Sequence, residues 1–134
     1  MRKTWLFTFG LCILLAILVV VSSCVSSTSS TPAPVTYSNT VAIAPGYLQT
    51  IPVSVTSSNR VQGSFTVQGG SGNDVNFSIK DPFGNQVLQA GVVSKSHSFA
   101  FVAATSGSYV LSFDNSFSMV SNKVVKYNFT VYWK

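Results

Sequence analysis

Apolar and polar residues alternate in short runs from about residue 37 to residue 133, and this period of two constrains the fold more than any other feature. Val75, Phe77 and Ile79, for example, are separated by single polar residues. Successive side chains of a β-strand point to opposite faces, so each run predicts a strand with one buried face. No run of helical period is long enough to compete. The sequence therefore predicts an all-β domain.

Turn signals separate the runs at intervals of about eight to twelve residues, which is typical of sandwiches and barrels. The expected strands are 40–44, 47–56, 61–68, 75–80, 86–93, 98–103, 107–113 and 124–133. Asp81-Pro82-Phe83-Gly84 has the composition of a type I turn between two of them. Pro52 lacks an N–H, which places its strand at a sheet edge or at a bulge. The pattern favours an antiparallel eight-stranded β-sandwich or a jelly roll.

The large side chains of these strands are expected to form one core without disulfide bonds or metals. The residues expected to dominate it are Phe65, Phe77, Phe99, Phe101, Tyr109, Phe113, Phe129 and Trp133. The single histidine, His97, stands among serines and a lysine and is expected at the solvated surface.

The amino-terminal segment has the plan of a secretory signal. Arg2 and Lys3 precede an uncharged apolar run over residues 5–21. Val21-Ser22-Ser23-Cys24 then resembles the bacterial lipobox, in which the cysteine thiol takes a diacylglyceryl group. We expect residues 1–23 to be a lipoprotein-type signal peptide and acylated Cys24 to hold the protein to membrane lipid, outside the cytoplasm in the cell envelope. The alternative is an uncleaved membrane anchor, for which the apolar run is short.

A Ser/Thr/Pro-rich segment follows Cys24 and has too little apolar surface to fold. We expect residues 24–38 to be a tether and residues 39–134 to be the folded domain. Since Cys12 would leave with the signal, Cys24 is expected to have no disulfide partner.

Five segments of the domain resemble, in order and spacing, the GOLD domain of the emp24/p24 cargo-trafficking family. They are 63–65, 74–84, 99–101, 107–118 and 121–125, and the pattern Tyr-x-x-x-Phe-Asp-Asn-x-Phe-Ser in 107–118 is the most specific. The resemblance implies an eight-stranded β-sandwich and a role in protein–protein contact. It departs from the family at Ser112, where many members have a cysteine. The lipobox also excludes a vesicle-coat cargo receptor.

The polar corner after residue 113 is expected to be structural. In the GOLD family the Asp-Asn pair is conformational, and Asp114 and Asn115 have side chains that can bond their own backbone. We expect this corner to let Phe117 enter the end of the core and Lys123 to open the last strand.

The composition argues against several functions. The formal charge is +5, but the positive residues are spread along the chain without a basic stripe, which argues against nucleic-acid binding. With three acidic residues and one histidine in 134, no catalytic or metal-binding cluster is evident, so we expect no enzyme activity and no cofactor. Two classes remain open: a module that binds an envelope or surface protein, and a carbohydrate-binding or pre-peptidase-type accessory sandwich. A row of exposed aromatic residues would favour the second, and a polar face with an unpaired edge strand would favour the first.

Overall fold

The computed structural model describes residues 30–134, which form eight β-strands and no helix. The strands are β1 (Val35–Ile43), β2 (Leu48–Val55), β3 (Arg60–Gln68), β4 (Asp74–Lys80), β5 (Gln86–Ser94), β6 (Ser96–Val102), β7 (Gly107–Asp114) and β8 (Lys123–Tyr132). The predicted all-β class is confirmed. The expected signal peptide, the apolar run and the acylation site Cys24 lie outside the described residues. Within residues 30–134, no helix could cross a membrane.

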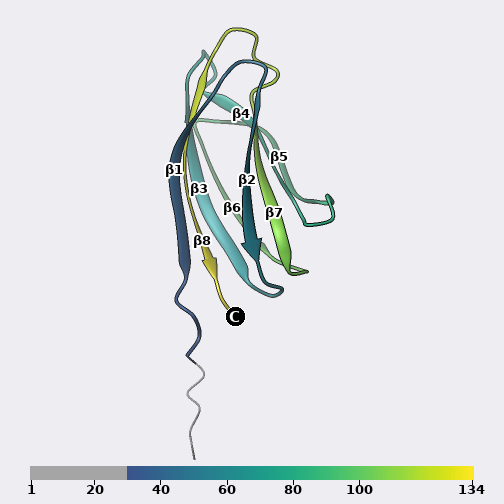
Figure 1. Ribbon diagram of the computed structural model, residues 1–134. Helices are drawn as coiled ribbons and strands as arrows, with labels where there is room; N and C mark the ends of the chain where they lie inside the picture. Colours follow the sequence, from purple (N-terminus) through teal and green to yellow (C-terminus); the bar gives the residue numbers. More distant parts are fainter. Residues whose placement is uncertain (1–29) are drawn as a thin grey trace, which may run out of the picture.

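The strands form two antiparallel four-stranded sheets that pack face to face (Figure 1). One sheet has the order β1-β8-β3-β6 and the other β2-β7-β4-β5. Except for the β4–β5 hairpin, every connection passes from one sheet to the other. This order is that of a jelly roll, built from two Greek keys. We call the sheet that contains β1 the front sheet and the other the back sheet.

The core lies between the sheets because each strand turns its apolar residues inward at every second position. In β7, for example, Tyr109, Leu111 and Phe113 are buried. Gly63 of β3 lies between Phe99 of β6 and Phe129 of β8, and any side chain there would collide with Phe129. The rings of Phe99 and Phe129 therefore meet across β3, with centroids 6.3 Å apart.

Two turn predictions are confirmed. β2 is an edge strand of the back sheet, in agreement with the missing N–H of Pro52. In the turn before β5, the N–H of Gly84 donates to the carbonyl oxygen of Asp81 at 3.0 Å. The side chain of Asp81 accepts hydrogen bonds from the N–H groups of Phe83 and Asn85, at 2.9 and 2.8 Å.

Three expectations are wrong. β1 begins at Val35 and pairs with β8 along its whole length, so the expected boundary after residue 38 falls inside a strand. Trp133 is only half-buried, because it lies beyond the end of β8 and not on the inward face of a strand. His97 is half-buried rather than solvated: it occupies an inward position of β6, with its ring centroid 5.8 Å from that of Phe65.

Candidate functional site

The connection between β7 and β8 is organised by a buried asparagine. Asn115 is fully buried, and its Nδ2 donates to the carbonyl oxygens of Ile43, Ala44 and Ser121 at 3.0–3.1 Å. Its backbone N–H also donates to the carbonyl oxygen of Tyr47 at 2.9 Å. One side chain thus joins the β1–β2 loop to the β7–β8 loop.

Asp114 and the serines of the loop complete this skeleton. Oδ1 of Asp114 accepts a hydrogen bond from the N–H of Ser116 at 2.7 Å, which is the local bond expected of an aspartate at a turn. The N–H of Ser118 donates to the carbonyl oxygen of Asn115 at 3.1 Å. The hydroxyl of Ser118 in turn accepts from the N–H of Ser121 at 3.2 Å. The loop therefore has a defined shape.

A buried ion pair fixes the start of β8. Lys123 lies on the inward face of the strand, and its Nζ contacts Oδ1 of Asp74 at 2.5 Å and the carbonyl oxygen of Gly69 at 3.1 Å. The Lys123 side chain is 4% exposed and that of Asp74 25%. Gly69 has a φ of +111°, and a side chain there would collide with the carbonyl oxygen of Asn122. A third loop, 69–73, is thereby packed against the other two.

Phe117 does not enter the core, so that expectation is also wrong. Its side chain is 47% exposed, and its ring lies on the outer side of the corner with the Nζ of Lys123 5.9 Å from the ring centroid. This distance is within the range of a cation–π contact, and about half of the Phe117 side chain stays exposed.

Phe117 belongs to a group of exposed apolar side chains on the two joined loops. Met119 and Val120 follow it and are 92% and 89% exposed. Tyr47 and Leu48, at the end of the β1–β2 loop, are exposed as well. Both loops lie at the end of the sandwich opposite the carboxyl terminus and the start of β1 (Figure 1). We call Tyr47, Leu48, Phe117, Met119 and Val120 the apolar tip.

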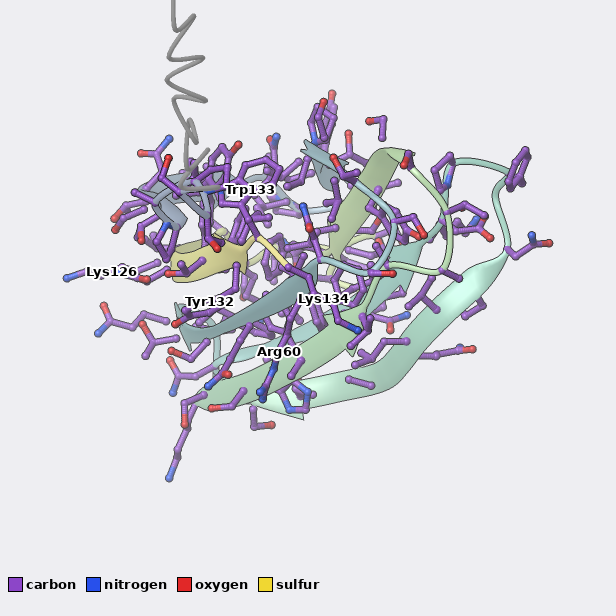
Figure 2. All side chains as sticks on the ribbon, turned by 90° about the horizontal axis from the view of Figure 1, so that it is seen from below. Arg60, Lys126, Tyr132, Trp133 and Lys134 are labelled. Atoms are coloured by element: carbon purple, nitrogen blue, oxygen red, sulfur yellow. The ribbon has the colours of Figure 1, made fainter. Side chains whose placement is uncertain are left out.

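The opposite end of the sandwich is polar, and the segment that precedes β1, which was expected to be a tether, reaches the domain there. The indole Nε1 of Trp133 donates to the carbonyl oxygen of Ala33 at 2.9 Å, which holds the chain against this end just before β1. Figure 2 looks onto this end and shows Arg60, Tyr132 and Lys134 there as well, apart from Trp133. We call this the tether end.

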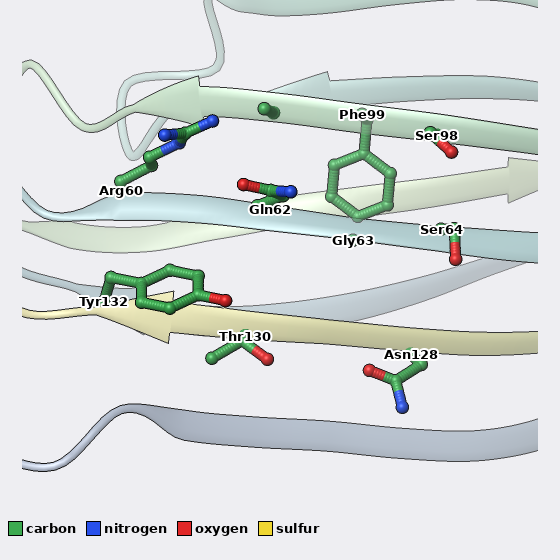
Figure 3. A pocket seen from close by; sticks show the side chains of 10 residues that line it. Arg60, Gln62, Gly63, Ser64, Ser98, Phe99, Asn128, Thr130 and Tyr132 are labelled. Carbon is green, nitrogen blue, oxygen red and sulfur yellow. The ribbon is translucent and has the colours of Figure 1, made fainter.

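The outer face of the front sheet carries a shallow groove of about 510 Å³ (Figure 3). The side chains of β3, β6 and β8 along it are hydroxyls, amides and one arginine, and no carboxylate lines it. Tyr132, at the end near Arg60, is its one exposed aromatic residue. The lining residues are Arg60, Gln62, Gly63, Ser64, Ser98, Phe99, Ala100, Asn128, Thr130 and Tyr132.

The sequence model of the emp24/gp25L/p24 family/GOLD matches residues 38–133, which is most of the chain. The chain belongs to this family. The match confirms the resemblance to the GOLD domain, and it ends one residue beyond β8. A search of curated protein sequences finds no match.

Two solved structures share limited similarity with this GOLD domain. PliG of Aeromonas hydrophila, a periplasmic inhibitor of g-type lysozyme, is 11% identical over 74% of this chain and 86% of its own, with a TM-score of 0.48. A protein of Bacillus endospore appendages, which are disulfide-linked pili, is 16% identical over 80% of this chain and 96% of its own, with a TM-score of 0.49. Similarity this low assigns neither a fold nor a function.

The structure brings the four predicted corner residues of the GOLD domain to one end and adds residues that sequence reasoning missed. Asp114 and Asn115 shape the loop and Lys123 lies beneath it, whereas Phe117 lies on its surface. The exposure of Met119 and Val120 was missed, although two consecutive apolar residues between serines in a predicted loop were a signal. The partner of Lys123 was missed because Asp74 is distant in the sequence.

Proposed function

We propose that this GOLD domain is a non-enzymatic protein-binding module, held to a membrane outside the cytoplasm by acylated Cys24, and that the apolar tip binds its partner. The observation that carries the proposal is the exposure of Phe117, Met119 and Val120 on a loop of defined shape. Contiguous exposed apolar groups of this kind mark interaction sites, because exposing them to water is unfavourable unless a partner covers them.

The internal support of the loop adds to this argument. A loop that had to order itself on binding would lose conformational entropy at that step. Here Asn115 and the Lys123–Asp74 pair already hold the backbone beneath the tip. The exposed side chains are thus presented for binding at a reduced entropic cost.

The location of the tip suits a tethered protein. Trp133 holds the chain at the opposite end, through the carbonyl oxygen of Ala33. The ten residues from 25 to 34 reach at most about 35 Å when fully extended. A domain anchored at Cys24 would therefore stay close to its membrane and could direct the tip toward other envelope or surface proteins.

Protein binding is favoured over carbohydrate binding by the outer face of the front sheet. A sugar-binding face usually offers several aromatic rings for stacking, whereas this face has Tyr132 alone. Its other groups are short hydroxyl and amide side chains, as on the solvated face of an ordinary antiparallel sheet.

The tip is tested with the double variant Met119→Ser/Val120→Ser of the full chain. The probe is the set of detergent-solubilised envelope proteins of the host cell, captured on the affinity-tagged chain. We expect the variant to lose a protein that the parent chain retains. Phe83→Ser is the matched control, because Phe83 is an exposed apolar loop residue in the β4–β5 turn. Retention of the partner by the tip variant, or equal loss in the control, would contradict the proposal.

The anchor is tested separately by mass spectrometry of the mature protein. We expect an amino terminus at Cys24 carrying a diacylglyceryl thioether, and loss of membrane retention in Cys24→Ser. An intact Met1 or an unmodified Cys24 would rule out the lipid anchor but would leave the tip experiment unaffected.

A further inference from the structure

The two sheets have four edge strands, and β1 is the longest of those that have no proline, no charge and no register shift. Proteins usually protect sheet edges with prolines, bulges, charges or short strands. β2 contains Pro52, β5 is interrupted by two register shifts against β4, and β6 has seven residues and joins β5 directly through Lys95. β1 has nine residues, no charge, no proline and an unbroken register with β8.

One hydrogen bond shows which backbone groups of β1 point to the open side. The N–H of Thr40 donates to the side-chain Oδ1 of its own neighbour, Asn39, at 2.8 Å. It is therefore not used by β8. Because residues of an antiparallel strand alternate between its two neighbours, the even-numbered residues from 36 to 42 present their N–H and C=O groups to the open edge.

The side chains of β1 are arranged symmetrically by chemical class about Asn39. On the inward face, Val35 and Tyr37 precede it and Val41 and Ile43 follow it. The outward face carries only small residues, in the order Thr-Ser-Thr-Ala. When a second copy of β1 runs antiparallel to the first about Asn39, side chains of the same chemical class therefore lie opposite each other.

We propose that β1 pairs antiparallel with β1 of a second copy of this chain, about a two-fold axis at Asn39. This register places Ser38 opposite Thr40 of the second copy and residue 36 opposite residue 42. These even-numbered residues point their N–H and C=O groups to the open edge, so each such pair exchanges two hydrogen bonds once the N–H of Thr40 leaves Oδ1 of Asn39. The two front sheets become one continuous sheet.

The pairing also covers apolar surface. Tyr37, stacked on Phe129 at 5.0 Å between centroids, is 37% exposed, and Val35 is 39% exposed. In the paired register Val41 of the second copy lies opposite Tyr37, and Ile43 opposite Val35. Apolar cross-strand pairs stabilise a sheet, and no like charges oppose each other along β1. The symmetry of the strand favours a second copy over a strand of unrelated sequence.

Single cysteines test the register. In the full chain with the substitutions Cys12→Ser and Cys24→Ser, an introduced cysteine carries the only thiol group. Asn39→Cys would face its own copy in a non-hydrogen-bonded pair, where the Cα atoms are about 4.5 Å apart and within disulfide range. Ser38→Cys would face residue 40 of the other copy, and two residues 38 would be too far apart to bridge. We expect a disulfide-linked dimer under mild oxidation for Asn39→Cys, and none for Ser38→Cys alone. A mixture of Ser38→Cys and Thr40→Cys chains should link.

Thr40→Pro provides the matching disruption. It removes an N–H that β8 does not use, so the domain is expected to keep its melting temperature. Added to Asn39→Cys, it should abolish the linked dimer. Equal linkage of Asn39→Cys and Ser38→Cys would overturn the proposal in favour of parallel pairing or random collision. Absence of linkage, or linkage of Asn39→Cys to a different protein in cells, would overturn it as well.

Discussion

The two ends of the sandwich use their residues in opposite ways. At the apolar tip, buried polar groups form the skeleton and apolar side chains face the solvent. At the tether end, Trp133 is half-buried against the chain while Arg60 and Lys134 are exposed. The same sheets continue through both ends, so the difference arises in the loops.

This difference separates two tasks, which are to fix the shape of a loop and to stabilise the fold. Polar groups inside the tip are costly to bury unless they are paired. Nδ2 of Asn115 and Nζ of Lys123 are held by backbone carbonyl oxygens and by Asp74, whereas the buried Oδ1 of Asn115 has no partner among the described residues. Such a skeleton fixes loop shape but offers little gain in stability, whereas apolar groups turned inward would have offered more. This arrangement supports the proposal that the tip binds a partner.

Removing the Lys123 ammonium group should have the largest effect. Lys123→Ala leaves Asp74 without its partner, and breaking a buried pair costs about 3–5 kcal/mol, here toward the lower value because Asp74 is partly exposed. Urea unfolding measures the loss. Lys126→Ala, an exposed lysine on the same strand, is the control and should change little. If Lys123→Ala lowers the free energy of unfolding no more than Lys126→Ala does, the ion pair does not support the tip.

Asn115→Ala should have the next largest effect. It leaves the carbonyl oxygens of Ile43, Ala44 and Ser121 without their shared donor, and unsatisfied buried groups cost about 1–3 kcal/mol. At the other end, Asn85→Ala removes an exposed amide that donates to Asp81 and should cost less than about 1 kcal/mol. Equal losses of free energy of unfolding would remove the contrast between the two ends.

The comparison of the two ends also shows what the sequence could predict. Alternation identified the strands and the inward faces of β3, β4 and β7, because a period of two is a property of the strand itself. It could also place Lys123 on the inward face, in phase with Val125. It could not supply Asp74 as its partner, since that contact depends on which loops meet at one end of the jelly roll.

Loops and strand ends were the places where prediction failed. Phe117 is apolar but lies in a loop, where no period tells inside from outside. Trp133 is in phase with the buried Val131, yet it lies past the end of the strand. Val35 follows a Pro-rich segment, and only the pairing with β8 shows that the strand has begun.

A smaller effect is expected at the tether end for Trp133→Phe. The variant keeps an aromatic ring but loses the hydrogen bond to Ala33, and a net hydrogen bond contributes about 0.5–1.5 kcal/mol. The loss should be local, because the bond holds only the entry of β1. Hydrogen exchange should therefore accelerate at Val35 and Tyr37, whose N–H groups face β8, and stay unchanged at Asn115. Acceleration at both ends would mean that the ends are coupled.

The smallest effect is expected from acid titration of Asp81. The hydrogen bond from the Asn85 side chain, opposed in part by desolvation and aided by backbone N–H groups, lowers the pKa of Asp81 below its usual value of 3.8. A lowered folded-state pKa favours the native state above the unfolded pKa, and this contribution is lost as the pH falls through the folded pKa. The free-energy difference between the parent chain and Asp81→Asn should therefore shrink as the pH falls below about 4. Acid effects that the parent chain and the variant share cancel in the difference. A difference that stays constant down to pH values where the parent unfolds would show that the charge of Asp81 does not stabilise the hairpin.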